Sequence, residues 1–181
     1  MVCIEDVYGF KPRSIMVFGI GGGGDVISAA MLAEGYRRCG LKAYVGSIVW
    51  ERFVVDPVPG PVELENLHNA KRIGDYSCSI DASVYAVRGG RKFVPQASKV
   101  AKVLGRPVYA VDLWGGVVGY RSGLEELQDH LGVEACMAVD VGGDDLAEGY
   151  EDDLWSPLAD SMGVAAFRGL KSKVLGVHGI G

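Results

Sequence analysis

Ile15-Met-Val-Phe-Gly-Ile-Gly-Gly-Gly-Gly-Asp25 is the stretch of sequence from which the fold of this chain can be inferred. Its first residues form an apolar run that is typical of a buried strand, and a run of glycines and an acid follow. An amphipathic segment begins directly after them. This order predicts the strand, glycine turn and helix with which α/β proteins hold a phosphate or a sugar against a helix N-terminus.

Six apolar runs predict strands, because they are rich in Val, Ile, Ala and Tyr and alternate little, as strands covered on both faces do. They span residues 14–18, 42–50, 79–87, 107–112, 135–141 and 173–177. Helical patterns separate most of them, at residues 25–39, 94–104, 122–131 and 156–168. We therefore expect one α/β domain over residues 1–181, a three-layer Rossmann-like fold around a mainly parallel sheet of about six strands.

Local signals place some of the helix boundaries. Ser122-Gly-Leu-Glu125 matches a capping box, and Ser156-Pro157 is typical of an N-cap followed by a first-turn proline. Asp56-Pro-Val-Pro-Gly-Pro61 cannot be helical, and we expect a short helix behind it at residues 64–73. The last strand is followed by a glycine turn without a helix, so we expect a fragment or a terminus that another element completes.

Composition narrows the partners of the chain. Its 181 residues are 49% hydrophobic and 23% charged, which is typical of a globular domain with a full core. The net charge of −5 argues against a nucleic-acid partner, because a phosphate backbone needs a basic face. The chain shows neither a signal peptide nor a membrane-length apolar run, and its four cysteines form no Cys-x-x-Cys pair. We expect a cytoplasmic protein without a membrane partner.

The glycine run is the first candidate site. In a parallel sheet, ligands bind beyond the carboxyl ends of the strands, near the point where the strand order reverses. The candidate ligand-binding residues here are Gly19, Gly21, Gly22, Gly23, Gly24 and Asp25. They match the dinucleotide fingerprint only formally, since a run of glycines satisfies many patterns, and Glu51, the expected ribose ligand, lies 27 residues beyond Gly24. A tight turn without ligand, with Asp25 as a helix cap, is the alternative.

Asp140-Val-Gly-Gly-Asp144-Asp145 is the second candidate site. Acids at a strand end and four and five residues later can converge on one hard cation, which predicts Asp140, Asp144 and Asp145 as ligands of Mg²⁺ or Ca²⁺. Gly142 and Gly143 would let the loop approach the ligand. The spacing is similar to the calcium loop of nucleoside hydrolases, where metal, ribose and attacking water meet. The alternative is a glycine turn whose acids cap the next segment.

Three further groups are candidates for chemistry at this edge. Arg52, between Glu51 and the later Asp56, suits a phosphate clamp, or else an internal ion pair that fixes the proline loop. His178, at a strand end beside glycines, is the histidine placed for acid–base work, and Asp144 is the carboxylate that we expect to activate water. The tryptophans lie near strand ends, where they either form an aromatic wall for a base or pack as core and lid: Trp50, Trp114 and Trp155.

Five motifs together resemble a family of archaeal hypothetical proteins grouped as the domain of unknown function numbered 1152. They are Gly19-Ile-Gly-Gly-Gly-Gly-Asp25-Val, Trp50-Glu-Arg52, Asp56-Pro-Val-Pro-Gly-Pro61, Val139-Asp-Val-Gly-Gly-Asp144 and Ser156-Pro-Leu-Ala-Asp160. The resemblance covers nearly the whole chain. The family has no established activity, so the resemblance implies no catalytic residue. Its members are usually longer, and the terminal Gly-Ile-Gly looks like the start of a further loop.

Three functions are consistent with these patterns. The first is a small-molecule enzyme that binds a nucleotide, nucleoside or phosphorylated sugar, with metal-assisted hydrolysis or transfer as its reaction. The second is a non-catalytic nucleotide-binding sensor or regulatory subunit, which needs the same glycine loop but no water-activating group. The third is an assembly module, a homo-oligomer in which the glycines are turns and the acidic run and proline loop form the interface.

Overall fold

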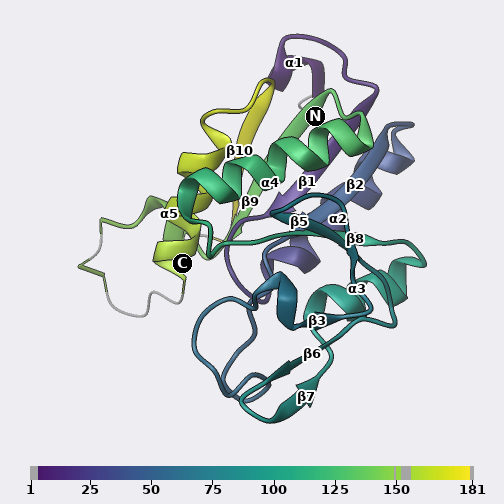
Figure 1. The fold of residues 1–181 in the computed structure, drawn as a ribbon. Helices are drawn as coiled ribbons and strands as arrows, with labels where there is room; N and C mark the ends of the chain where they lie inside the picture. Colours follow the sequence, from purple (N-terminus) through teal and green to yellow (C-terminus); the bar gives the residue numbers. More distant parts are fainter. Residues whose placement is uncertain (1–3, 149, 152–155, 180–181) are drawn as a thin grey trace.

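The computed structural model describes residues 4–148, 150–151 and 156–179 (Figure 1). In chain order its elements, with η for 3₁₀ turns, are α1 (Ile4–Tyr8), β1 (Ser14–Gly19), α2 (Asp25–Arg38), β2 (Lys42–Ser47), η1 (Leu64–Asn66), β3 (Leu67–His68), β4 (Lys71–Arg72), β5 (Ser77–Ile80), β6 (Tyr85–Arg88), β7 (Arg91–Phe93), α3 (Gln96–Leu104), β8 (Val108–Val111), α4 (Gly116–Leu131), β9 (Ala135–Val141), η2 (Asp144–Leu146), α5 (Pro157–Phe167) and β10 (Lys173–His178).

The large sheet has seven strands in the order β10-β9-β1-β2-β8-β5-β4. The first five of these strands are parallel to one another, whereas β5 and β4 are antiparallel to their neighbours. From β1 the chain builds β2 and β8 on one side and then crosses to add β9 and β10 on the other. The strand order therefore reverses between β1 and β9. This confirms the expected α/β fold with a mostly parallel sheet.

Helices cover both faces of the sheet, so the expected three layers are present (Figure 1). Alternate residues of β1 enter different cores: Ile15 and Val17 pack with α2 and α3, while Met16 and Phe18 pack with α4 and α5. Every residue of β1 is consequently buried. This explains why its sequence is a continuous apolar run, since a strand covered on both faces has no solvent side.

A three-stranded antiparallel sheet, β3-β6-β7, lies beside the large one. The single strand expected at residues 79–87 is wrong, because β5 and β6 belong to different sheets. The backbone amide and hydroxyl of Ser83 donate hydrogen bonds of 2.7 and 2.6 Å to Asp81, and this turn separates the two strands. The helix expected at residues 64–73 is also wrong, since only the short η1 forms before β3 and β4.

The capping box at Ser122 does not start a helix. Helix α4 begins six residues earlier, at Gly116, and Ser122 lies within it. The sequence around its first turns is rich in glycine, which usually disfavours helix. Here Gly119 lets α4 lie against Tyr76, because a Cβ on Gly119 would approach the Tyr76 ring to 2.7 Å. Packing has overridden propensity. In the described part of the chain, no helix combines the length and apolar character needed to cross a membrane.

A buried ion pair anchors the proline-rich loop that follows β2. Arg88 Nη1 donates to Asp56 Oδ2 at 2.6 Å, and the two side chains are 6% and 0% exposed. Arg88 also donates to the carbonyl oxygen of Gly60, at 3.1 Å. An ion pair therefore fixes this loop, but its arginine is Arg88, whereas the sequence suggested Arg52.

We predict that Arg88→Ala lowers the free energy of unfolding by about 3–5 kcal/mol, because it leaves the Asp56 carboxylate buried without its partner. Urea unfolding followed by circular dichroism measures the change. Arg106→Ala is the control, since Arg106 pairs with Glu34 while 52% exposed, and we expect about 0–1 kcal/mol there. Equal effects of the two substitutions would contradict the anchoring role of the buried pair.

Candidate functional site

The loops that follow β1, β2 and β9 surround a cavity of about 470 Å³. This is the side of the sheet where the carboxyl ends of the parallel strands lie, next to the reversal between β1 and β9. Open α/β sheets bind ligands at such reversals. The described lining residues are Gly22, Gly23, Gly24, Asp25, Trp50, Glu51, Arg52, Phe53, Pro59, Gly60, Val141, Gly142, Asp144 and Ser156.

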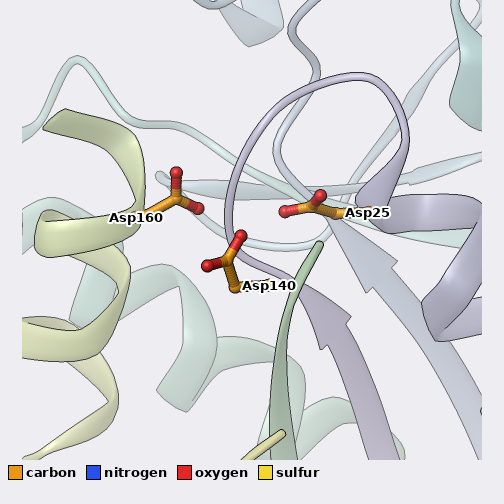
Figure 2. Close-up of side chains that lie close together, drawn as sticks. All are labelled: Asp25, Asp140 and Asp160. Carbon is orange, nitrogen blue, oxygen red and sulfur yellow. The ribbon is translucent and has the colours of Figure 1, made fainter. Parts of the chain in front are cut away.

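Three aspartates converge at the base of these loops (Figure 2). Asp25 is the first residue of α2, Asp140 lies near the end of β9, and Asp160 is in the first turn of α5. One carboxylate oxygen from each lies within 4.8 Å of the other two, and the residues are only 4%, 1% and 0% exposed. We call them the aspartate triad. They could hold a metal ion, because all three ligand atoms are carboxylate oxygens that meet at one point.

The glycine run creates the space for the triad. The Gly21 amide donates to Asp25 Oδ2 at 2.6 Å, and a Cβ on Gly21 would collide with both Asp25 and Asp160. A Cβ on Gly19 would lie 2.7 Å from the backbone carbonyl carbon of Asp25. These two glycines therefore let the start of α2 and the carboxylates lie directly against the end of β1.

Burial makes the triad electrostatically costly. Burial, joined by the charges of Asp160 and Asp140, raises the pKa of Asp25 to about 8. Burial, joined by the charges of Asp140 and Asp144, raises the pKa of Asp160 to about 7. Among residues 4–148, 150–151 and 156–179, no lysine or arginine forms an ion pair with any of the three. At neutral pH the triad must therefore take up protons or a cation.

A further hydroxyl lies next to the triad without a partner. Tyr120 of α4 is fully buried, and within the described part of the chain its hydroxyl makes no hydrogen bond. Burial, and then the charges of Asp160 and Asp25, raise its pKa well above the ordinary value. Neither carboxylate oxygen of Asp160 meets the geometry of a hydrogen bond with a described residue, although the Ser156 side chain is near enough to lower its pKa. Orphaned buried polar atoms of this kind usually indicate a bound ion or water.

The sequence predicted that Asp140, Asp144 and Asp145 together bind a cation, but the structure arranges these three acids of the β9 loop differently. Asp144 Oδ2 accepts a 2.7 Å hydrogen bond from the Ser156 amide, so it ties this loop to the start of α5, and it lines the cavity. The Asp145 amide donates to Asp140 Oδ2 at 3.1 Å. Burial and the neighbouring Asp140 raise the pKa of Asp145 to about 7. The structure thus groups Asp140 with Asp25 and Asp160, and places Asp144 and Asp145 beside them.

The glycine amides are only partly available to a ligand. The Gly21 amide binds Asp25, and the Gly23 amide donates to the carbonyl oxygen of Trp50 at 3.0 Å. Among the described residues, the amides of Gly22 and Gly24 donate no hydrogen bond. Helix α2 also carries its own acid, Asp25, in the first turn, where a dinucleotide-binding helix would present a pyrophosphate site. The loop therefore lacks the electrostatics of a bare phosphate cradle.

The remaining residues that the sequence suggested lie outside the aspartate triad. Glu51 Oε1 accepts a 2.6 Å hydrogen bond from the Gln96 amide at the start of α3, and burial raises the pKa of Glu51. Gly142 and Gly143 have φ values of 119° and 96°, so the turn after β9 requires glycine at both. His178 is exposed at the end of β10, and its carbonyl oxygen accepts the Gly142 amide.

Only some of the histidine, acidic and aromatic candidates lie at the cavity. His178 is not among the described residues that line the cavity, whereas Glu51 and Arg52 are. Trp50 lines the cavity, Trp114 packs on the proline loop by donating to the Pro61 carbonyl oxygen at 2.9 Å, and Trp155 lies outside the described residues.

Asp160 is the site residue that sequence reasoning did not select. The pattern that marks it is an acid inside an otherwise apolar helix, Pro157-Leu-Ala-Asp-Ser-Met-Gly-Val-Ala-Ala-Phe167. An acid on the buried face of such a helix needs a partner or a function. Asp160 ends the motif Ser156-Pro-Leu-Ala-Asp160, which contributed to the family resemblance but did not indicate a role for this aspartate.

The fold and the site together define an α/β protein with a mostly parallel sheet and a buried acidic group that could hold a metal ion. Residues 16–181 match the family described as "Protein of unknown function (DUF1152)", and the chain belongs to this family. Comparison with curated proteins and with solved structures gave no match.

We predict that the metal-free protein loses stability as the pH rises from about 4 to about 8. The ordinary aspartate pKa is 3.8, whereas that of Asp25 is about 8 when folded. In this interval the folded state holds protons that the unfolded chain has released, so the free energy of unfolding falls with increasing pH. Urea unfolding at several pH values in the presence of EDTA measures the slope.

Asp160→Asn should make this slope shallower, because it removes one of the buried acids. Asp129→Asn, a change of an exposed acid on α4, should leave the slope as it is in the unmodified protein. If the free energy of unfolding did not change between pH 4 and pH 8, the raised pKa values of the triad would be contradicted.

Proposed function

We propose that this protein is a small-molecule enzyme that binds a nucleotide, a nucleoside or a phosphorylated sugar together with a divalent cation, and that it catalyses metal-assisted hydrolysis or transfer. The observation that supports this most strongly is the aspartate triad, buried beside a cavity at the strand-order reversal. Buried carboxylates without counter-charges are rare in a purely structural role, because desolvation opposes their ionisation. A bound cation removes this cost.

The donor set favours a hard cation, Mg²⁺ or Ca²⁺. The triad consists of carboxylate oxygens, without the cysteine or histidine ligands that favour zinc. Metal–oxygen distances of about 2.0–2.6 Å place opposite ligand atoms about 4–5 Å apart. The triad oxygens, within 4.8 Å of one another, fit this span. The orphaned oxygens of Asp160 support the same assignment.

The chain supplies three kinds of group for a substrate. Arg52, on the cavity wall, suits a phosphate oxygen, and the Gly22 and Gly24 amides can donate to the same anion. A cation held by the triad would lower the pKa of a bound water and polarise a phosphoryl or glycosyl oxygen. Asp144 lines the cavity beside the triad and is the carboxylate that we assign to accept the proton of the attacking water. His178 has no role in this proposal.

We predict that Mg²⁺ or Ca²⁺ raises the melting temperature of the EDTA-treated chain, and that Asp140→Asn and Asp160→Asn weaken cation binding at least about tenfold. Isothermal titration with each cation alone measures the affinity. A nucleotide, nucleoside or phosphosugar at 100 times its dissociation constant should then add about 2.7 kcal/mol of stability, only in the presence of the cation. Asp129→Asn should behave like the unmodified protein.

Two results would overturn the proposal. If nucleotide binds without cation and Asp144→Asn changes neither binding nor turnover, the protein is a sensor rather than an enzyme. If neither cation nor any of these ligands binds, the glycine loops are structural turns, and light scattering should then show a defined homo-oligomer.

A further inference from the structure

The segment that follows β2 contributes apolar residues to the cavity lining. They are Trp50, Phe53, Pro59 and Gly60, and Glu51 and Arg52 lie between Trp50 and Phe53. Trp50 contacts the glycine loop directly. Its carbonyl oxygen accepts the Gly23 amide, and its Cβ lies 3.6 Å from the position that a Cβ on Gly22 would take. The cavity lining thus combines acids and glycine amides with the aromatic side chains of Trp50 and Phe53.

Phe53 is exposed in a way that its surroundings do not explain. Its side chain is 69% exposed at the cavity wall. The neighbouring Val54 is 77% exposed, so two adjacent large apolar side chains face water beside the cavity, and contiguous apolar surface of this kind marks binding sites. Phe53 is also held in place, since the amides of Val55 and Asp56 donate to the Arg52 carbonyl oxygen at 2.8 and 3.0 Å and close a turn around it.

The base of this loop is rigid as well. The buried pair of Asp56 and Arg88 fixes the end of the turn, and Arg88 holds the carbonyl oxygen of Gly60, another wall residue. The Trp114 ring covers the outer side of Gly60, with a ring carbon 3.4 Å from the position of a Cβ there. Phe53 is therefore presented on a fixed support, and a preformed aromatic surface binds a planar group with little loss of entropy.

We propose that the ligand of this cavity is a nucleoside phosphate, whose base stacks on Phe53 and packs against Trp50 while its phosphate reaches Arg52 and the cation side. This inference rests on the proposed function, because it assigns the second half of the same site. The cavity of about 470 Å³ lies within the range of small-molecule sites, about 300–1,000 Å³. A phosphorylated sugar lacks the aromatic ring of a base, so it would cover less of the Phe53 ring than a nucleotide.

The test compares nucleoside 5′-monophosphates with ribose 5-phosphate, which shares the sugar and the phosphate but lacks the base. Isothermal titration with Mg²⁺ present gives the dissociation constants of the four common monophosphates and of ribose 5-phosphate for the full chain. We expect the tightest monophosphate to bind at least about tenfold more tightly than ribose 5-phosphate. Phe53→Ala should weaken that monophosphate about tenfold and leave ribose 5-phosphate unchanged.

Two further variants make the result specific. Phe53→Tyr keeps a ring and should retain nucleotide affinity. Val103→Ala removes another apolar side chain, 87% exposed on α3, and should change neither ligand. Because Phe53 is largely exposed, its substitutions should leave the melting temperature of the free protein unchanged.

The outcomes separate this inference from the proposed function. Equal, Mg²⁺-dependent binding of ribose 5-phosphate and the monophosphates, or a Phe53→Ala variant with unaltered nucleotide affinity, overturns the inference and leaves the proposed function standing. Absence of binding by every ligand and by Mg²⁺ alone overturns both.

Discussion

The burial of three carboxylates at one point constrains the rest of this site. Asp25, Asp140 and Asp160 come from α2, β9 and α5, and their oxygens meet within 4.8 Å. Each loses hydration, and their like charges oppose one another, so their convergence is unfavourable unless protons or a cation compensate. Strong packing elsewhere must hold them there, and it does: β1 is buried throughout, and α2 and α5 each pack against β9. Stability of the scaffold thus maintains a locally unfavourable arrangement, as is usual at functional sites.

The topology of the sheet explains why these acids can meet. Strands β1 and β9 are parallel neighbours, with Gly19 beside Val139, although 120 residues separate these two positions in the sequence. The chain leaves β1 toward α2 and the β2 side, and leaves β9 toward α5 on the opposite face of the sheet. The two connections diverge and leave a crevice above the paired strand ends. Asp25 and Asp160 enter this crevice from opposite faces, and Asp140 rises from its floor (Figure 2).

Much of this arrangement could be predicted from the sequence, because the deciding patterns are local. The apolar run of β1 and the position of Asp140 at a strand end imply the sheet edge and its acids. Asp160 could not be selected, since nothing local states that the first turn of α5 faces this edge. The split of residues 79–87 escaped prediction because the Asp81–Ser83 turn is made by short-range side-chain bonds within an apolar context. The start of α4 escaped because its glycines serve packing on Tyr76 rather than turn formation.

The glycine run shows why a motif must be interpreted together with the acid that follows it. In a dinucleotide site, glycines free the amides of a helix N-terminus for a pyrophosphate. Here the helix begins with Asp25, which already takes the Gly21 amide and lies at the positive end of the α2 dipole. An anionic ligand that approached this end directly would meet a carboxylate. A cation between them would make the same carboxylate attractive, because protein and phosphate oxygens could then share the cation. Two of the glycines, Gly19 and Gly21, make room for the acids, while the amides of Gly22 and Gly24 have no hydrogen-bond partner among the described residues.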